Sequence, residues 1–420
     1  MYNSVHLFNT YQIPIFRRPN HDSGPLQKIR HARSSLYIGR GEAAIQPAPN
    51  DGLMVAAYIN ALFQCILFVA IPFLVAGKKN LKCEDSTGLT GPYLYVTVHD
   101  TVGNILKYTL DGCLVDEKVL YFEDEDLFRR YPELRSMVIS SYPAHNVSEA
   151  LYVADASLHN SQVLVFDKCI DHGPDKGKRR YLATAIDSYL NDGESFTHPL
   201  THSLFTSSFT TYLGADHTYG LCFDYDHNLY ASFQHTDAVL RLDTSFVPMP
   251  LPPAFKRYRR DDFFPGSFVQ FGSAGEHHYS ETGVRSIVNI RTNLLVANED
   301  YNGVLVVSIS TGLVSEIIPV DKPVGLHYDK HKDILFVGSK SQKYGGVIYA
   351  LDGKDYAVLK VYTYGKMTHP TGITLFNDIL YVGEQNTNTV VKFNVESGKF
   401  LGVVVDHLPG LVEQIIVSPC

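Results

Sequence analysis

Histidine, arginine, amide and carboxylate side chains recur in this sequence at two fixed places relative to a repeated apolar triplet, in which Leu is followed by Tyr, Leu or Phe and then by Val or Ala. Three of them, His217, Arg285 and His369, precede the Leu of a triplet by 9 to 12 residues. The others follow that Leu by 4 or 5 residues: His99, Asn298, Glu299 and Glu384. Imidazole nitrogens suit zinc, and carboxylate and amide oxygens suit calcium. Such a set could bind a ligand, hold a divalent cation or transfer protons, provided that the fold brings it together.

No local motif assigns a reaction to these residues. His198 and His202 have the spacing of metal ligands on a helix, but Pro199 argues against a helix there. His277 and His278 form an adjacent pair, and we interpret all four histidines as loop residues. The sequence has no G-x-S-x-G, P-loop, H-E-x-x-H or C-x-x-C pattern, so nucleophilic hydrolysis has no local support.

The elements that must position the polar residues are six repeats of short strands. The triplets begin at Leu94, Leu151, Leu229, Leu294, Leu335 and Leu380. An apolar residue that ends a further strand follows 13 to 16 residues after each of these leucines. In the stretch His369–Asn394, the sequence predicts three consecutive strands separated by turns. Such a meander cannot bury a core alone, so six of them predict an all-β, six-bladed β-propeller.

The first triplet has no convincing inner strand in front of it. The C-terminal segment Leu411–Val417 is apolar and has no blade of its own. We therefore expect a ring that is closed by the C-terminal strand, because closure removes two exposed sheet edges. In such a ring the inner strands begin near the central channel. His217, Arg285 and His369 should then line that channel, and the residues that follow the triplets should approach the same axis.

The segment HPTGI…ILYVGEQNTNTVVKFN at His369–Asn394 resembles the NHL-repeat unit, and the pattern extends over roughly residues 90–418. A ring of six such repeats is also similar to the wider group of gluconolactonase-like and paraoxonase-like propellers. The resemblance implies the fold more strongly than a function, since propellers host unrelated chemistries.

The resemblance also implies two kinds of channel cation. Lactonase-like relatives hold calcium there by carboxylate and amide oxygens, and amidating lyases, which are also NHL-like, place histidines there for zinc. This sequence matches neither pattern residue by residue. Asn298 and Glu384 are the candidate metal ligands, for calcium or zinc. In the alternative that we favour, Glu384 and Asp155 only cap the turn of their own blade.

The N-terminal part differs from the repeats in composition. Residues 1–52 are polar and basic, with no hydrophobic period, and are predicted to be a disordered leader. Leu53–Ala76 is a 24-residue apolar run without charge. It is long enough to be a membrane-spanning signal anchor, or it contains a signal peptide cleaved near residue 77. Either interpretation sends the propeller, residues 83–420, into the secretory pathway, as a lumenal or extracellular domain on a single-pass anchor or as a secreted protein.

Cysteines and a sequon fit that compartment. Asn146 begins an Asn-Val-Ser acceptor for glycosylation. Five cysteines follow the apolar run, and Cys222 is expected to be a small core residue. We predict a disulfide between Cys83 and Cys420, because both should lie at the seam where the chain begins and ends its first blade. Paraoxonase-like propellers, which this arrangement resembles, have a terminal bridge of this kind. Two free thiols at the chain ends are the alternative.

Charge and loop lengths restrict the function. The whole chain carries a net charge of −8, and residues 1–52 carry +3, which leaves −11 for the remainder. Nucleic acid is therefore not expected as a partner. One hypothesis is an extracytoplasmic module that binds a protein or a glycan; long insertions near residues 113–136, 169–213 and 245–282 favour it. The other is a metal-dependent hydrolase or amidating lyase that acts in the channel on a small ester, lactone or peptide amide.

Overall fold

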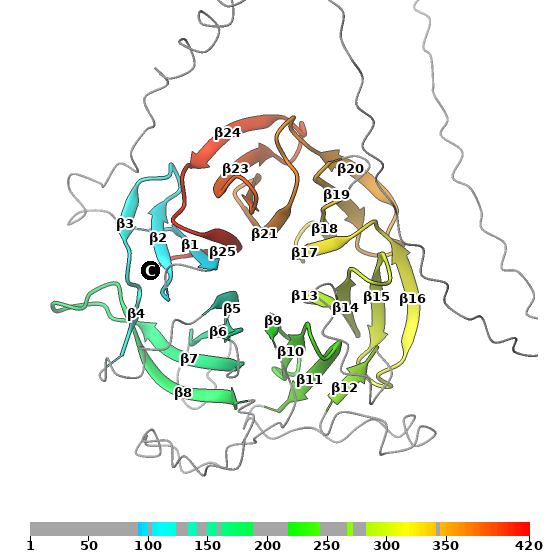
Figure 1. The fold of residues 1–420 in the computed structure, drawn as a ribbon, viewed down its shortest axis with the longest axis horizontal. Helices are drawn as coiled ribbons and strands as arrows, with labels where there is room; N and C mark the ends of the chain where they lie inside the picture. Colours follow the sequence, from blue (N-terminus) through cyan, green and yellow to red (C-terminus); the bar gives the residue numbers. More distant parts are fainter. Residues whose placement is uncertain are drawn as a thin grey trace, which may run out of the picture. The chain divides into compact units, whose positions relative to one another are not determined.

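A computed structural model shows six small β-sheets arranged around a central axis (Figure 1). The structure describes residues 91–99, 103–122, 133–140, 149–157, 161–187, 217–243, 267–271, 283–341 and 345–420. Five of the sheets have four strands and one has five. The predicted six-bladed β-propeller is therefore confirmed.

Each blade is an antiparallel meander that runs outward from an inner strand. Blade 1 consists of β25 (Leu411–Ser418), β1 (Tyr93–His99), β2 (Leu106–Thr109) and β3 (Leu114–Asp116). Blade 2 consists of β5 (Leu134–Ile139), β6 (Leu151–Asp155), β7 (Gln162–Cys169) and β8 (Arg179–Asp187), and β4 (Leu120–Tyr121) joins its outer edge in parallel. Blade 3 consists of β9 (Thr218–Phe223), β10 (Leu229–Phe233), β11 (Ala238–Leu242) and β12 (Ser267–Gln270).

The other three blades follow the same order. Blade 4 consists of β13 (Val284–Ile290), β14 (Asn293–Asn298), β15 (Gly303–Ser308) and β16 (Val314–Pro319). Blade 5 consists of β17 (Pro323–Asp329), β18 (Ile334–Ser339), β19 (Val347–Asp352) and β20 (Val358–Tyr362). Blade 6 consists of β21 (Pro370–Phe376), β22 (Ile379–Glu384), β23 (Thr389–Asn394) and β24 (Phe400–Val405).

The core consists of six apolar clusters, each of which lies between two neighbouring blades. Tyr152 of β6 faces the cluster shared with blade 3, whereas Leu151 and Val153 face the cluster shared with blade 1. Both faces of this second strand are thus buried, and the same holds in the other blades. This explains why the second strands are continuous apolar triplets instead of alternating patterns.

The C-terminal strand closes the ring as predicted. β25 pairs with β1 along its whole length, from Tyr93 opposite Ser418 to His99 opposite Leu411. It supplies the inner strand that the first triplet lacks, and the two ends of the propeller are joined within one sheet (Figure 1).

A β-bulge interrupts every inner strand at the same level. In blade 2, for example, Arg135 and Ser136 together face Ala154 of β6. The same shift occurs at Tyr219-Gly220, Arg285-Ser286, Val324-Gly325, Thr371-Gly372 and Glu413-Gln414. A bulge re-aims side chains, so that both residues of the pair can reach the channel.

The predicted disulfide between Cys83 and Cys420 is wrong in its partner. Cys420 is bonded to Cys169 at the end of β7, with a Cα–Cα distance of 5.9 Å. The reason is the length of β7 and β8, whose hairpin extends to the C-terminal residues: the Cys420 sulfur lies 3.7 Å from the carbonyl oxygen of Gly177. Cys113 is also disulfide-bonded, and Cys222 is free and buried, as expected of a core residue.

Several other predictions fall outside the described residues. These are the leader, the apolar run Leu53–Ala76, Cys83, Asn146, and the loop histidines His198, His202, His277 and His278. Within the described part of the chain, no helix is long and apolar enough to cross a membrane.

Candidate functional site

The residues predicted to line the channel belong to a network of buried charges where the inner strands begin. Its first centre is Glu413 of β25, which is buried. Arg135 of blade 2 forms an ion pair with this carboxylate. Tyr219 of blade 3 donates its hydroxyl to Glu413 at 3.1 Å, and the amide of Gln385 of blade 6 donates at 2.8 Å. One carboxylate therefore connects four blades.

The second centre is Glu299, which follows β14 and is completely buried. The Nε of Arg285 donates to it at 2.7 Å, and the Nζ of Lys340 lies 2.5 Å from its other oxygen. Arg285 also donates to the amide oxygen of Gln234 at 2.8 Å. The two centres meet at the ring of Tyr219. The guanidinium carbon of Arg285 lies 5.0 Å from the centroid of this ring, and that of Arg135 lies 5.8 Å from it.

Four histidines surround these charges. His99 contacts Glu133 at 3.0 Å, and this hydrogen bond is the main cause of the lowered pKa of that carboxyl. His217 stacks on His235 with 4.3 Å between ring centroids. Burial, reinforced by nearby cations, lowers the pKa of His217 to about 2 and that of His369 to about 3. The imidazoles of His217 and His369 are therefore neutral at ordinary pH.

The carboxylate and amide residues considered for a metal bind backbone groups of their own blades. Glu384 accepts hydrogen bonds from the backbone nitrogens of Thr368 and His369 at 3.0 Å. Asn298 accepts from Asp300 and Tyr301 with its carbonyl oxygen, and donates to Asp237. In the described ranges, no group of three or more His, Cys, Asp or Glu side chains is placed to hold a metal ion.

The structure thus divides the predicted site residues into two groups. His99, His217, Arg285, Glu299 and His369 lie in or beside the network of charges. Asn298 caps the turn that follows β14, and Glu384 binds the backbone of its own blade, as the favoured alternative expects of Glu384. Asp155 does the same, because its carboxylate accepts from the backbone nitrogens of Glu133 and Ser157.

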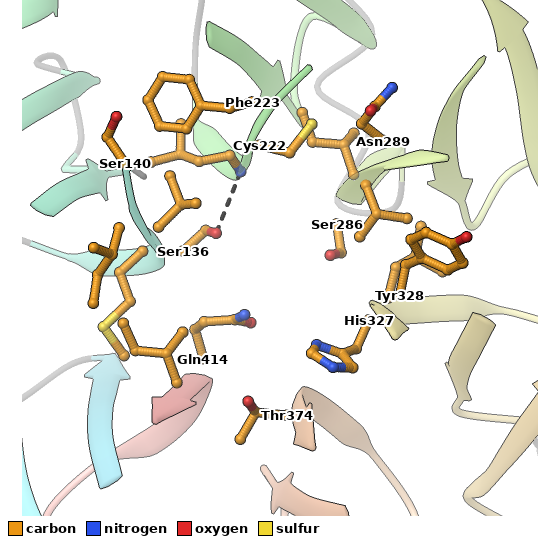
Figure 2. Close-up of a pocket in the computed structure, with 18 of the residues that line it drawn as sticks. Ser136, Ser140, Cys222, Phe223, Ser286, Asn289, His327, Tyr328, Thr374 and Gln414 are labelled. Carbon is orange, nitrogen blue, oxygen red and sulfur yellow. Dashed lines mark hydrogen bonds between the residues drawn. The ribbon is translucent and has the colours of Figure 1, made fainter. Parts of the chain in front are cut away.

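A cavity of about 490 Å³ occupies the channel beyond the network, from the bulges to the ends of the inner strands. Figure 2 shows polar side chains that point into this space from five blades: Ser136, Ser286, His327, Thr374 and Gln414. The inner strands are also the terminal members of their sheets, so one edge of each is unpaired and faces the channel. Such edges present backbone N–H and C=O groups to whatever fills the cavity.

His327 is the residue that sequence reasoning missed. Its imidazole points into the cavity (Figure 2), and burial lowers its pKa to about 4, so that the ring is neutral and offers one donor and one acceptor. The feature that distinguishes this blade is the residue at the second position of the bulge. Blades 1, 2 and 4 have a polar second bulge residue, whereas blades 5 and 6 have Gly325 and Gly372 there and place His327 and Thr374 two residues later.

Comparisons with known proteins do not assign the chain to a family. No protein family model matches the chain, and no curated protein matches it. Among solved structures, the chain is similar to one in the crystal structure of a nidogen/laminin complex, with 12% identity and a TM-score of 0.47, over 78% of this chain and 98% of that one. It is similar also to a protein of unknown function from Bacteroides caccae, with 10% identity and a TM-score of 0.47, over 78% of this chain and 99% of the other.

Proposed function

We propose that the protein is an extracytoplasmic binding module whose channel cavity takes a small, uncharged ligand with several hydrogen-bonding groups. One observation carries this proposal: uncharged donors and acceptors converge on a single cavity from blades all around the ring. The cavity volume of about 490 Å³ is typical of sites for small molecules.

The buried ion pairs of the network lie outside this cavity. Two charged residues do line it: Asp224 accepts hydrogen bonds within its own turn, and Lys330 is exposed. Ser136, Ser286 and Gln414 line it, but the charged residues that precede them in each bulge do not. Arg135, Arg285 and Glu413 instead neutralise one another or Glu299. Beside the neutral side chains of the inner strands, a charged ligand would be desolvated without a counter-ion, which is unfavourable, whereas a neutral polar ligand would keep its hydrogen bonds.

The location outside the cytoplasm rests on separate support. A disulfide such as Cys169–Cys420 is typical of proteins that fold in oxidising compartments. The apolar run Leu53–Ala76 and the acceptor Asn146 point in the same direction. A binding module in that setting would meet soluble metabolites, glycans and surface molecules.

The proposal can be tested with the full chain and a panel of small molecules in calorimetry. The panel contains uncharged sugars, amides and nucleosides, and charged analogues of similar size. We expect uncharged members to bind and Ser286→Phe, which fills the cavity, to abolish that binding. The matched control is Ser310→Phe, on an exposed turn between β15 and β16. Binding only of charged compounds, or binding that survives Ser286→Phe, would refute the proposal.

A further inference from the structure

Two exposed aromatic rings stand out on the described surface, and one of them lies at the mouth of the cavity. Tyr225, in the turn between β9 and β10, is 60% exposed, and Tyr301, between β14 and β15, is 50% exposed. Tyr225 lines the cavity and Tyr301 does not, because their turns lie at opposite ends of the ring. An exposed aromatic side chain adds little to folding, and at the mouth of a cavity it can pack against a ligand that extends out of the cavity.

The turn that carries Tyr225 is rigid. Asp224 is buried and accepts hydrogen bonds from the backbone nitrogens of Asp226 and Asn228 at 2.9 and 2.8 Å. It also accepts from the side chains of Asn228 and Tyr230 at 2.8 and 3.0 Å. The backbone that presents Tyr225 is thus fixed before any ligand arrives, which reduces the entropy lost on binding.

A second aromatic ring at the mouth is fixed in a similar way. Tyr328, at the end of β17, lines the cavity and donates its hydroxyl to Asp333 at 2.8 Å. Asp333 is itself held by Arg291 of blade 4 at 2.5 Å. The cavity therefore has polar groups in its interior and two aromatic rings at its mouth, one on a preorganised turn and one held by its hydroxyl.

We infer that the ligand is the end of a carbohydrate chain, whose terminal sugar enters the cavity while the next sugar stacks on Tyr225. This rests on the proposed function of the cavity. A sugar is uncharged, and its hydroxyls donate and accept, as the strand edges and side chains of the interior require. Its ring also has apolar C–H faces, which pack on aromatic rings. A chain fits better than a free sugar, because Tyr225 lines the cavity while its ring is largely exposed, so that a second unit at the mouth would contact it.

The test uses the full chain and matched series of saccharides: glucose, N-acetylglucosamine and galactose, each with its linear di- and trisaccharides. Affinities are measured by calorimetry. We expect at least one series to bind, with the trisaccharide tighter than its monosaccharide. Tyr225→Ala should weaken the trisaccharide by about tenfold, the size of one lost aromatic contact, and leave the monosaccharide unchanged. Tyr225→Trp should retain trisaccharide binding, and Tyr301→Ala is the control without effect.

The outcomes separate this inference from the function on which it rests. If amides or nucleosides bind in a manner sensitive to Ser286→Phe and no saccharide binds, the carbohydrate inference is wrong and the binding function stands. If no uncharged compound binds at all, both fail. If Tyr225→Ala weakens mono- and trisaccharide equally, or neither, the placement of a second sugar on Tyr225 is wrong.

Discussion

Cys169 is bonded to Cys420, which links the outer part of blade 2 to the strand that closes blade 1. The bridge spans 251 residues of sequence and reinforces the one seam at which the two ends of the propeller meet. Loss of a native disulfide with a long loop destabilises a fold by about 2–5 kcal/mol. We expect Cys420→Ser to lower the free energy of unfolding by an amount in that range, measured by denaturant titration. Cys222→Ala, which removes a free thiol, should lower the free energy of unfolding by less.

Peptide mapping without reductant should yield the 169–420 pair, and a peptide that joins Cys83 to Cys420 would contradict this pairing.

The ion pair of Arg135 and Glu413 offers a second test, because both side chains are buried. Replacement of Glu413 by Gln removes the buried carboxylate that pairs with Arg135 and leaves only the more exposed Glu133, 3.7 Å away, as its acidic partner. Loss of one partner of a buried pair typically costs about 3–5 kcal/mol, and Glu133 should keep the loss near the lower end of that range. The double variant Arg135→Met with Glu413→Gln should recover part of that loss. Asp378→Asn removes the exposed partner of Lys332 and should change stability by less than about 1 kcal/mol. Equal effects of Glu413→Gln and Asp378→Asn would show that the network does not stabilise the channel.

The neutral histidines predict how stability depends on pH. Their pKa values in the folded protein lie below the usual 6.5, at about 2 for His217, 3 for His369 and 4 for His327. Their contribution to stability is thus complete above pH 6.5 and declines as the pH falls, since only the unfolded chain takes up the protons. Burial raises the pKa of Asp155 and Asp237 to about 6, which acts in the opposite direction over part of this range.

The contribution of one histidine can be isolated by substitution. His217→Gln removes one proton taken up on unfolding, so the slope of unfolding free energy against pH should decrease by about 1.4 kcal/mol per pH unit between pH 4 and 6. His331→Gln, at an exposed position, serves as the control. An unchanged slope in His217→Gln would mean that His217 is protonated in the folded protein.

The repeats were predictable from the sequence because the blades bury both faces of their second strands. Leu151 and Tyr152 are adjacent in sequence yet face different neighbouring blades, and this recurs as a visible apolar triplet. Leu411–Val417 was recognisable because it is an apolar segment that belongs to no other blade. The first blade lacked an inner strand, and the segment pairs with β1 in that position.

The cavity could not be predicted in the same way. The bulges shift the phase of each inner strand, so that the residues which reach the cavity differ between blades: Ser136 in one, His327 in another. The partner of Cys420 depended on how far the β7–β8 hairpin extends, and nothing in the spacing of Cys83 and Leu94 reports that length.

The predicted location has its own test. Full-length protein made in cells with a secretory pathway should carry an N-linked glycan at Asn146. Endoglycosidase treatment should then increase its mobility in electrophoresis, and Asn146→Gln should abolish that shift. An unglycosylated protein confined to the cytosol would contradict an extracytoplasmic role.

A thiol placed at position 286 tests the binding cavity most directly, because the side chain of Ser286 points into the cavity (Figure 2). The native thiol Cys222 is buried, and burial raises its pKa, so it is a poor probe. The full chain with Ser286→Cys and Cys222→Ala is incubated with iodoacetamide, with and without a saturating uncharged ligand identified by calorimetry, and mass spectrometry gives the rate of alkylation at position 286. We expect the ligand to slow this rate in proportion to occupancy, and the alkylated protein no longer to bind the ligand. A ligand that binds while position 286 reacts at an unchanged rate would place the binding site outside the channel.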